Sequence, residues 1–312
     1  EFFELYHDNG QCVRLNHRTY DTAPDFTTAE GIASILEQVR QTAPAERYAM
    51  TIGSHGMAWL PVSGIYARPG SAAPREREYW EYAAEGAALT RWFGGKLDQY
   101  RTDIPTLAEG ITLAGMEMEY ILFDDCYMSS VEVAYDLRHV TDYLIACPTE
   151  IMAYGMPYAE VGPELLGEPD YEAVCSKFLD FYSSYTYPYG TIGVTRISEL
   201  DSLARVLRKI EAAYDLDTSL RPALQRMDGY RPPIFYDLGD YVAALCTDTA
   251  LLSEFEGQLD RAVPYKAHTP QYYSAFSGAE DIRAYSGITT SAPTTSSYAA
   301  DWAATSWYEA TH

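Results

Sequence analysis

The stretch Tyr120-Ile121-Leu122-Phe123-Asp124-Asp125-Cys126 sets an apolar run of strand length directly before two carboxylates and a thiol. A second stretch, Tyr48-Ala49-Met50-Thr51-Ile52-Gly53-Ser54-His55-Gly56, has the same form and ends at a histidine. Short apolar runs bounded by turn residues indicate buried strands. If the two strands are parallel neighbours, their polar ends meet at one edge of the sheet, where open α/β sheets bind ligands.

The remaining chain supplies the other elements of an α/β fold. Apolar residues recur at helical spacing after Thr27-Thr28-Ala29-Glu30, where Glu30 is placed to support a cap at Thr27. Ser129 or Ser130 is expected to cap the helix after Cys126. We predict further strands at 2–6, 143–147, 190–196 and 262–266, further helices at 80–100, 171–184, 199–214 and 238–261, and a loop at 148–163. Strands that alternate with helices predict a mostly parallel sheet flanked by helices on both faces.

Composition restricts the class of protein. The chain has 312 residues, of which 47% are hydrophobic, and this is enough apolar material for a sizeable core. Its formal net charge of −23 argues against a nucleic-acid partner, because phosphates favour Lys and Arg. No run of about 20 apolar residues occurs, so no membrane span is expected. The five cysteines include no CxxC pair, so neither a disulfide scaffold nor a zinc site of that type is expected.

Cys126 and His55 are the residues best placed for nucleophilic catalysis. A cysteine attacks as thiolate, and the positive end of the helix that follows Cys126 is expected to lower its pKa. An imidazole at the neighbouring strand end would take the thiol proton and pass it to a leaving amine. The backbone N–H groups of Gly56 and Cys126 are the expected donors to an oxyanion. Taken singly, the two motifs also fit a buried cysteine and a turn histidine.

Both motifs resemble those of one known family, the clostripain-type cysteine peptidases. Residues 48–59 are similar to the family's histidine motif, a strand followed by H-G-x-x-W. Residues 123–137 are similar to its nucleophile motif, F-D-x-C-x-M-x-x-x-E-x-A-Y-x-L. The resemblance covers nearly the whole chain, with further similar segments at 143–146, 154–158, 235–241, 285–289 and 307–308.

The resemblance implies a caspase-like fold and hydrolysis of peptide bonds after Arg or Lys. It implies one domain over 1–312, with a catalytic core at about 1–200 and a helical C-terminal extension at about 201–312. His55 is then the general base and acid, and Cys126 is the nucleophile that forms a thioacyl-enzyme. Asp124 is the implied contact for a basic P1 side chain, with a helix cap as its alternative role.

Two neighbouring residues have further expected roles, and two departures from the family's pattern affect this interpretation. Trp59 is expected either to wall the substrate pocket or to belong to the core, and Asp125 to be structural. Members with a second carboxylate in the S1 pocket carry it just before the glycine that matches Gly155, where this chain has Tyr154. The family also opens with a strand and helix upstream of the segment that Phe2 begins. The chain is therefore expected to be a fragment or processed form, or to lack a sheet strand.

A loop rich in Gly, Pro, Ser and charge, at 63–78, lies between the two motifs. Exposed loops are preferred sites of nicking, and the resemblance implies that cleavage in this region activates some relatives. Pro69 makes Arg68 a poor site, so Arg75 and Arg77 are the predicted sites of self-processing. The alternative is an ordinary solvated loop.

The sequence therefore predicts a cysteine endopeptidase that acts on peptides or proteins without a cofactor. Some relatives depend on calcium, but the chain has no D-x-D-x-D-G loop. The N-terminus lacks the basic start of a signal peptide, so any targeting segment has been removed or lies outside this chain. We expect a secreted, cell-surface or periplasmic protein. Two alternatives stay open: a caspase-like module that binds peptides without cleaving them, and a thiol transferase or amidase on the same fold.

Overall fold

The computed structural model describes residues 1–21, 25–60, 93–94, 100–293 and 296–312. The loop predicted at 63–78, with Arg75 and Arg77, lies outside these residues, as does most of the helix predicted at 80–100. Within that predicted helix, Phe93–Gly94 forms strand β4 instead, which pairs with β5 (Arg101–Thr102).

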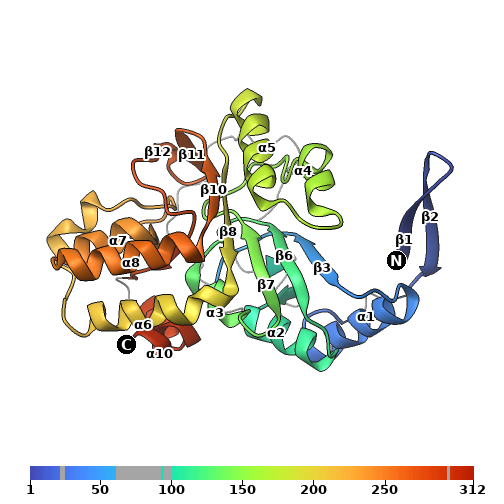
Figure 1. Ribbon diagram of the computed structural model, residues 1–312, viewed down its shortest axis with the longest axis horizontal. Coiled ribbons are helices and arrows are strands. Elements are labelled where there is room, and N and C mark those ends of the chain that lie inside the picture. Colours follow the sequence, from blue (N-terminus) through green and yellow to red (C-terminus); the bar gives the residue numbers. More distant parts are fainter. Residues whose placement is uncertain (22–24, 61–92, 95–99, 294–295) are drawn as a thin grey trace.

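A five-stranded mixed sheet forms the centre of the molecule, with strand order β10-β8-β7-β6-β3 (Figure 1). Its strands are β3 (Tyr48–Gly53), β6 (Met118–Asp124), β7 (Thr141–Ala146), β8 (Thr191–Arg196) and β10 (Tyr265–His268). β3, β6 and β7 are parallel neighbours, whereas β8 runs antiparallel to both β7 and β10. The half of the sheet that carries the two motifs is therefore parallel, as predicted.

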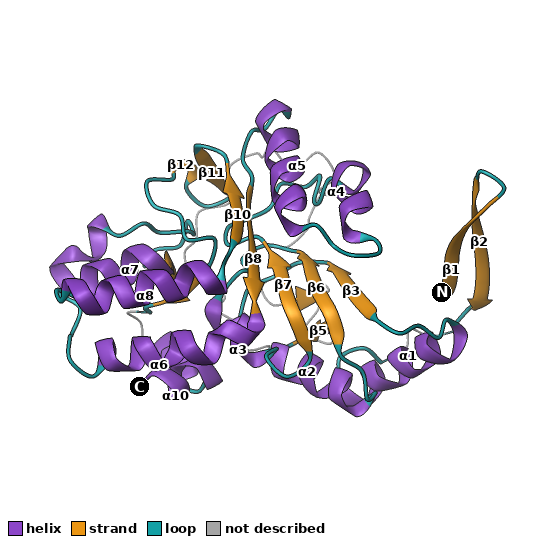
Figure 2. Ribbon diagram, viewed as in Figure 1, coloured by secondary structure: helices purple, strands orange, loops and turns teal. Residues whose placement is uncertain are grey.

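Helices cover both faces of this sheet (Figure 2). Successive strand residues point to opposite faces, so in β6 Leu122 packs into one core and Phe123 into the other. The Leu122 core contains residues of α4 (Tyr158–Leu165) and α5 (Tyr171–Ser184). The Phe123 core contains residues of α1 (Ala29–Thr42), α2 (Ile104–Leu113), α3 (Val131–Asp136) and α6 (Leu200–Glu211). Burial on both faces explains the continuous apolar runs of the central strands.

Two helix caps differ from the predicted ones. Thr28, not Thr27, caps α1, and its hydroxyl accepts a hydrogen bond from the Gly31 N–H (3.2 Å). Neither serine before α3 caps it by a side-chain hydrogen bond: Ser129 donates to the Gly287 carbonyl (2.8 Å) and Ser130 donates to Glu132. Ser129 thus bonds a distant carbonyl, and Ser130 bonds the carboxylate of Glu132 in the first turn of α3, so neither hydroxyl is left to accept from a backbone N–H of the helix by a cap bond.

Two predicted segments differ from the observed ones: the loop at 148–163 contains part of a helix, and the helix at 238–261 is broken. α4 begins at Tyr158, within the segment 148–163 that we expected to be a loop, and Pro163 lies inside the helix. The helix predicted at 238–261 is divided into α7 (Leu238–Leu245) and α8 (Thr249–Ala262). The division occurs at Asp248, whose carboxylate accepts from the N–H groups of the first turn of α8.

The C-terminal extension contains strands as well as the predicted helices. Its elements after α6 are η3 (Thr218–Ala223), β9 (Phe235–Asp237), α7, α8, β10, β11 (Gln271–Ser274), β12 (Gly278–Asp281), β13 (Thr289–Ser291), α9 (Ser296–Ala303) and α10 (Ser306–Thr311). β10 joins the main sheet, and the buried Glu132 of α3 accepts from the Ser291 N–H (2.8 Å) and the Trp302 indole (3.1 Å). The extension is therefore packed into the same sheet and core as the rest of the chain.

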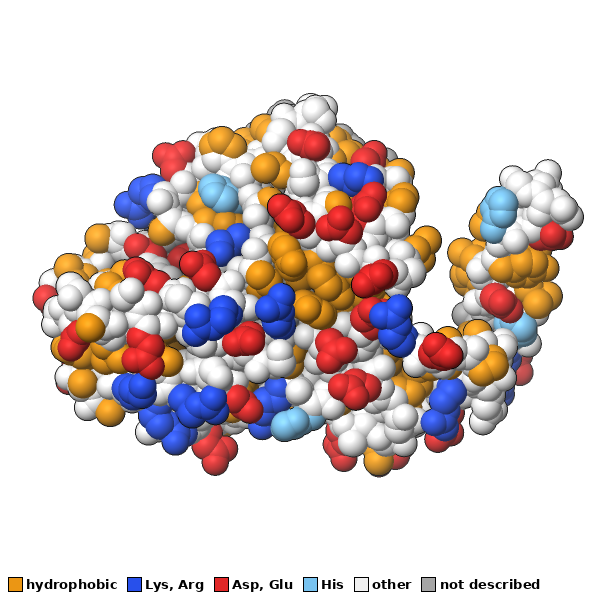
Figure 3. Space-filling model, viewed as in Figure 1, with side chains coloured by type: hydrophobic (Ala, Val, Ile, Leu, Met, Phe, Trp, Pro, Cys, Tyr) orange, Lys and Arg blue, Asp and Glu red, His pale blue; other side chains and the backbone are white. Residues whose placement is uncertain are grey.

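An antiparallel hairpin, β1 (Phe2–Asp8) and β2 (Gln11–Arg18), projects from the body of the molecule (Figures 1 and 3). The sequence analysis identified only the first of these strands. Asn9 and Gly10 between them both have positive φ angles, 49° and 84°, the geometry that Asn-Gly favours in tight hairpin turns. The apolar side chains exposed on this hairpin are Phe3, Leu5, Tyr6 and Leu15.

Candidate active site

The two polar clusters lie side by side because β3 and β6 are parallel neighbours (Figure 1). Gly53 pairs with Asp124 in the last step of their ladder. The segments 54–56 and 125–126 therefore leave the sheet at the same edge. The prediction that both clusters share one edge is confirmed.

Gly56 lies directly against the segment that carries Cys126. A Cβ atom at this position would lie 2.5 Å from the Cys126 carbonyl oxygen, 2.8 Å from Asp125 Cβ and 2.8 Å from Met128 Cγ. Real Cβ atoms essentially never approach other atoms within 3.0 Å, so only glycine fits here without a shift. This close approach brings together the backbone segments of the two expected oxyanion donors.

His55 is exposed at this edge of the sheet. Its carbonyl accepts a hydrogen bond from the Gly94 N–H (3.1 Å), which fixes its backbone from the side opposite β6. Neighbouring protein atoms partly desolvate the imidazole, and this lowers the pKa of His55 from its ordinary 6.5. The ring is therefore neutral at neutral pH, which is the form that a general base requires.

Cys126 is half-buried, and its thiol lies 4.0 Å from the Ile151 carbonyl oxygen. Burial raises the pKa of the thiol well above its ordinary value, and the charges of Glu150, Asp125 and Asp124 raise it further. α3, the helix that was expected to lower this pKa, begins only at Val131. The expectation of a lowered thiol pKa is therefore wrong, because desolvation and three carboxylates outweigh a short and distant helix.

The segment after β7 holds the turn that follows Cys126. Tyr127 has a φ angle of 65° and donates its N–H to the Thr149 carbonyl (3.0 Å), while the Ser129 N–H donates to the Cys147 carbonyl (3.1 Å). The Tyr127 hydroxyl donates to the buried carboxylate of Glu150 (2.7 Å). The sequence analysis missed Glu150, since no spacing in the chain relates it to the nucleophile motif.

Asp124 anchors the loop that leads from β7 into α4. Its carboxylate accepts from the Met156 N–H (2.9 Å) and the Tyr158 hydroxyl (3.0 Å), and it does not cap α3. Gly155, with a φ angle of 75°, packs against it, and a Cβ there would lie 2.7 Å from Asp124 Oδ1. Burial raises the pKa of Asp124, while the two hydrogen bonds oppose the rise. A carboxylate offers about four acceptor positions, and the residues that the structure describes occupy two of those of Asp124.

The other residues singled out near this edge have packing roles. The Tyr154 ring is exposed and lies 4.6 Å from the Phe181 ring and 5.6 Å from the Tyr185 ring, centroid to centroid. Trp59 is 7% exposed, and its indole N–H donates to the Ser291 hydroxyl (2.7 Å). Of the two roles expected for Trp59, membership of the core fits this position.

The described ranges hold no group of three or more His, Cys, Asp or Glu side chains arranged to bind a metal ion. Nor does any helix in those ranges have the length and apolar character needed to cross a bilayer.

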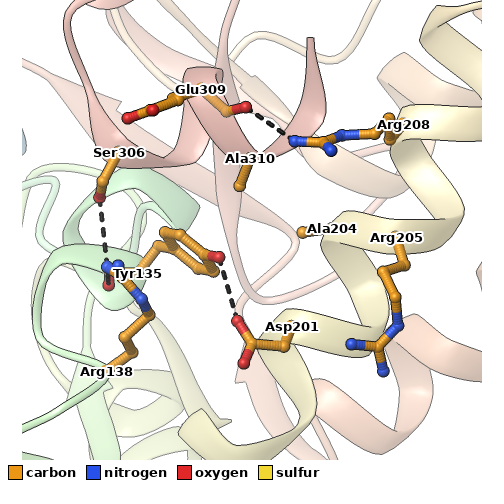
Figure 4. Close-up of a pocket in the computed structure, with 9 residues that line it drawn as sticks. All are labelled: Tyr135, Arg138, Asp201, Ala204, Arg205, Arg208, Ser306, Glu309 and Ala310. Atoms are coloured by element: carbon orange, nitrogen blue, oxygen red, sulfur yellow. Dashed lines mark hydrogen bonds between the residues drawn. The ribbon is translucent and has the colours of Figure 1, made fainter.

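A pocket of about 410 Å³ lies between α3, α6 and α10, and none of its lining residues belongs to the two strand-end clusters (Figure 4). Two arginines in it already donate to carbonyls, Arg138 to Tyr135 (2.7 Å) and Arg208 to Glu309 (2.9 Å).

A thiol and a neutral imidazole at the ends of adjacent parallel strands, in a sheet covered by helices, define the class of caspase-like cysteine peptidases. Comparisons with known proteins narrow the class to one family. The sequence profile of the clostripain family matches residues 79–234. No curated protein matches the chain in sequence.

Solved structures agree with this assignment. A secreted C11 cysteine protease from Bacteroides thetaiotaomicron, described as "iotapain", is 51% identical, with a TM-score of 0.89 over 99% of this chain and 84% of that chain. A clostripain from Bacteroides thetaiotaomicron ATCC 29148, in complex with the peptide inhibitor BTN-VLTK-AOMK, is 55% identical. Its TM-score is 0.69, over 71% of this chain and 99% of that chain. An inactive zymogen C11 protease from Parabacteroides distasonis is 28% identical. Its TM-score is 0.80, over 99% of this chain and 83% of that chain. The chain belongs to the clostripain family of cysteine proteases, which confirms the predicted family, fold class and enzyme class.

Proposed function

We propose that this cysteine protease cleaves peptide bonds after Arg or Lys by a His55/Cys126 dyad, through a thioacyl-enzyme. The observation that carries the proposal is the parallel pairing of β3 with β6, with Gly53 opposite Asp124. Because of this pairing, the histidine and cysteine segments leave the sheet together, and Gly56 contacts the backbone of Cys126.

The reaction begins from a neutral thiol and a neutral imidazole, since the pKa of Cys126 is raised and the pKa of His55 is lowered. His55 takes the thiol proton while sulfur attacks the carbonyl carbon, and the oxyanion accepts from the N–H groups of Gly56 and Cys126. His55 then protonates the leaving amine, which leaves the thioacyl-enzyme. Water, deprotonated by His55, attacks the thioester, releases the acid product and restores the thiol.

Asp124 supports a basic preference at P1. It lies two residues before the nucleophile and is half-buried, and the residues that the structure describes occupy two of its about four acceptor positions. The 55% identical clostripain is in complex with an inhibitor whose peptide part, VLTK, ends in lysine. Tyr154 stands where some relatives have a second carboxylate, so the preference for a basic residue depends on the single charge of Asp124.

The natural substrates are then peptides or proteins with accessible lysine or arginine residues. A secreted or surface location fits, because the 51% identical relative is described as secreted. Arg75 and Arg77 are proposed as self-processing sites, in keeping with the relative that is described as an inactive zymogen.

Substitution of the nucleophile tests the dyad. Cys126→Ala is expected to lower kcat by at least about a thousandfold, because the covalent step is lost. The melting temperature should stay close to that of the parent protein, since the change removes one atom from a half-buried side chain. A variant that retains more than about one hundredth of the activity would contradict the assignment. Labelling of Cys126 by a peptidyl electrophile separates a protease from a module that only binds peptides.

Asp124→Asn tests the P1 pocket. A hydrogen bond to a charged group contributes about 1.5–3 kcal/mol, so kcat/KM on lysyl and arginyl peptides should fall about 10- to 150-fold. Peptides with a neutral P1 residue should lose far less. The matched control is Asp142→Asn. Asp142 is exposed and lies at the start of β7, whereas Asp124 lies at the end of the parallel strand β6. Cleavage of a peptide library after acidic or aromatic residues would show that the pocket is assigned wrongly.

A further inference from the structure

Asp125, the residue directly before the nucleophile, has no role in the reaction described above. Its side chain is nevertheless fully buried. One carboxylate oxygen accepts from the Ser54 backbone N–H, and the Ser54 hydroxyl lies within hydrogen-bond distance of both the other carboxylate oxygen (3.3 Å) and the His55 carbonyl (3.2 Å). Ser54 directly precedes His55, so the neighbour of the nucleophile is bonded to the neighbour of the base.

The same side chain contacts the other neighbour of His55 as well. A Cβ atom at Gly56 would lie 2.8 Å from Asp125 Cβ, so the Gly56 backbone packs against the Asp125 side chain. The backbone ladder between β3 and β6 ends at Gly53 and Asp124. Beyond that step, the Asp125 side chain contacts the residues before and after His55: it bonds Ser54 and packs against Gly56.

Ser54 also bonds a third segment, strand β4. Its hydroxyl accepts from the Gly94 N–H (3.0 Å), and the same N–H also donates to the His55 carbonyl (3.1 Å). The peptides on either side of His55 are thus fixed by a chain of hydrogen bonds that begins at the Asp125 carboxylate. The region that the imidazole can reach is set by the position of this backbone, because only two side-chain torsions separate the ring from it.

The burial of Asp125 has an electrostatic cost. Burial raises the pKa of its carboxyl to about 7, the two hydrogen bonds from Ser54 oppose the rise, and the charge of Asp124 adds to it. In return the charge of Asp125 raises the pKa of Cys126, Cys147 and Tyr158. No salt bridge to Asp125 occurs in the part of the chain that the structure describes. A buried carboxylate without a cation destabilises a fold, so its contacts on both sides of His55 point to a geometric role.

We propose that Asp125 is a positioning residue for the catalytic pair, which holds the His55 segment against the nucleophile segment through Ser54 and Gly56. The proposal rests on the proposed function, because it assumes that His55 and Cys126 react together. Asp125 acts through His55 and does not itself take part in bond making.

Three variants test this role. Asp125→Ala removes both bonds to Ser54, whereas Asp125→Asn keeps an acceptor for the Ser54 N–H and offers an N–H to its hydroxyl. The matched control is Asp237→Ala, since Asp237 is also buried and accepts from both the backbone N–H and the hydroxyl (2.9 Å) of one serine, Ser286. We would measure kcat and KM on a lysyl peptide at a temperature where all variants are folded. The rate of Cys126 alkylation by iodoacetamide would be followed against pH by mass spectrometry of the peptide that contains it.

Asp125→Ala should lower kcat about 100-fold with KM nearly unchanged, because a misplacement of about 1 Å has this effect on a reacting group. Asp125→Asn should keep kcat within about threefold and should shift the alkylation profile of Cys126 to lower pH, since one negative charge near the thiol is lost. Asp237→Ala should lower the melting temperature and leave kcat unchanged. If Asp125→Ala does not fold, Asp125→Ser replaces it, because its shorter side chain cannot reach both partners.

Three results would overturn the proposal: a folded Asp125→Ala with parental kcat, an equal loss of kcat in Asp237→Ala, or a loss in Asp125→Asn as large as in Asp125→Ala. Failure of the proposed function has a different signature. In that case the parent protein hydrolyses no peptide, or Cys126→Ala keeps its activity. A shift in the alkylation profile of Asp125→Asn would then still report the position of Asp125 beside the thiol.

Discussion

Addition of one methyl group at Gly56 is expected to separate the two halves of the catalytic pair. In Gly56→Ala the new Cβ would lie 2.5 Å from the Cys126 carbonyl oxygen, where an ordinary contact begins at 3.4 Å. The backbone segments must therefore move apart by about 0.9 Å, since the obstructing atom belongs to a peptide group and cannot rotate away. A misplacement of about 1 Å at a catalytic group lowers the rate about 100-fold. Overpacking of this kind also destabilises a core by about 1–3 kcal/mol.

The assay compares Gly56→Ala with Gly53→Ala, which adds the same methyl group three residues earlier. At Gly53 the nearest atom to the new Cβ is Asp124 Cβ, at 4.0 Å, which is an ordinary contact. We expect parental kcat/KM for Gly53→Ala and about one hundredth of it for Gly56→Ala, both measured on a lysyl peptide below the melting temperatures. Parental kcat/KM in a folded Gly56→Ala would refute the argument that the two segments meet in this way.

Three further outcomes are expected. Because the neutral imidazole is the active form and the pKa of His55 is lowered, the acid limb of kcat/KM should lie below pH 6.5; a limb above 6.5 in a pH-rate profile would contradict this sign. On incubation, the purified protein should acquire a new N-terminus at Glu76 or Glu78 that Cys126→Ala never acquires; a chain that stays whole while it cleaves peptides at full rate speaks against self-processing. Tyr127→Phe removes a hydrogen bond to a buried carboxylate and should lower the free energy of unfolding by about 1–3 kcal/mol in urea, whereas an unchanged value would show that this bond contributes nothing.

Local pattern was sufficient to predict most of the sheet. The apolar runs at 48–52, 120–123 and 143–147 became β3, β6 and β7, because their continuous hydrophobicity fits strands that are buried on both faces. The helix at 171–184 was predicted with its observed bounds. Predictions failed where a side chain had a choice of partners: the Ser129 hydroxyl bonds the distant Gly287 carbonyl, and the Ser130 hydroxyl bonds the Glu132 carboxylate, so neither caps α3.

The sequence by itself determined the family and the identity of the residues proposed as nucleophile and base, whereas it left the parallel pairing of the two motif strands as a condition that the structure met. These follow from periodicity and from motifs of contiguous residues, which a linear reading contains in full. Only the tertiary structure decided the protonation states of the thiol and imidazole and the surroundings of Asp125. A pKa depends on desolvation and on charges that approach through space, and the residues responsible, Glu150 beside Cys126 and Ser54 beside Asp125, are far from them along the chain.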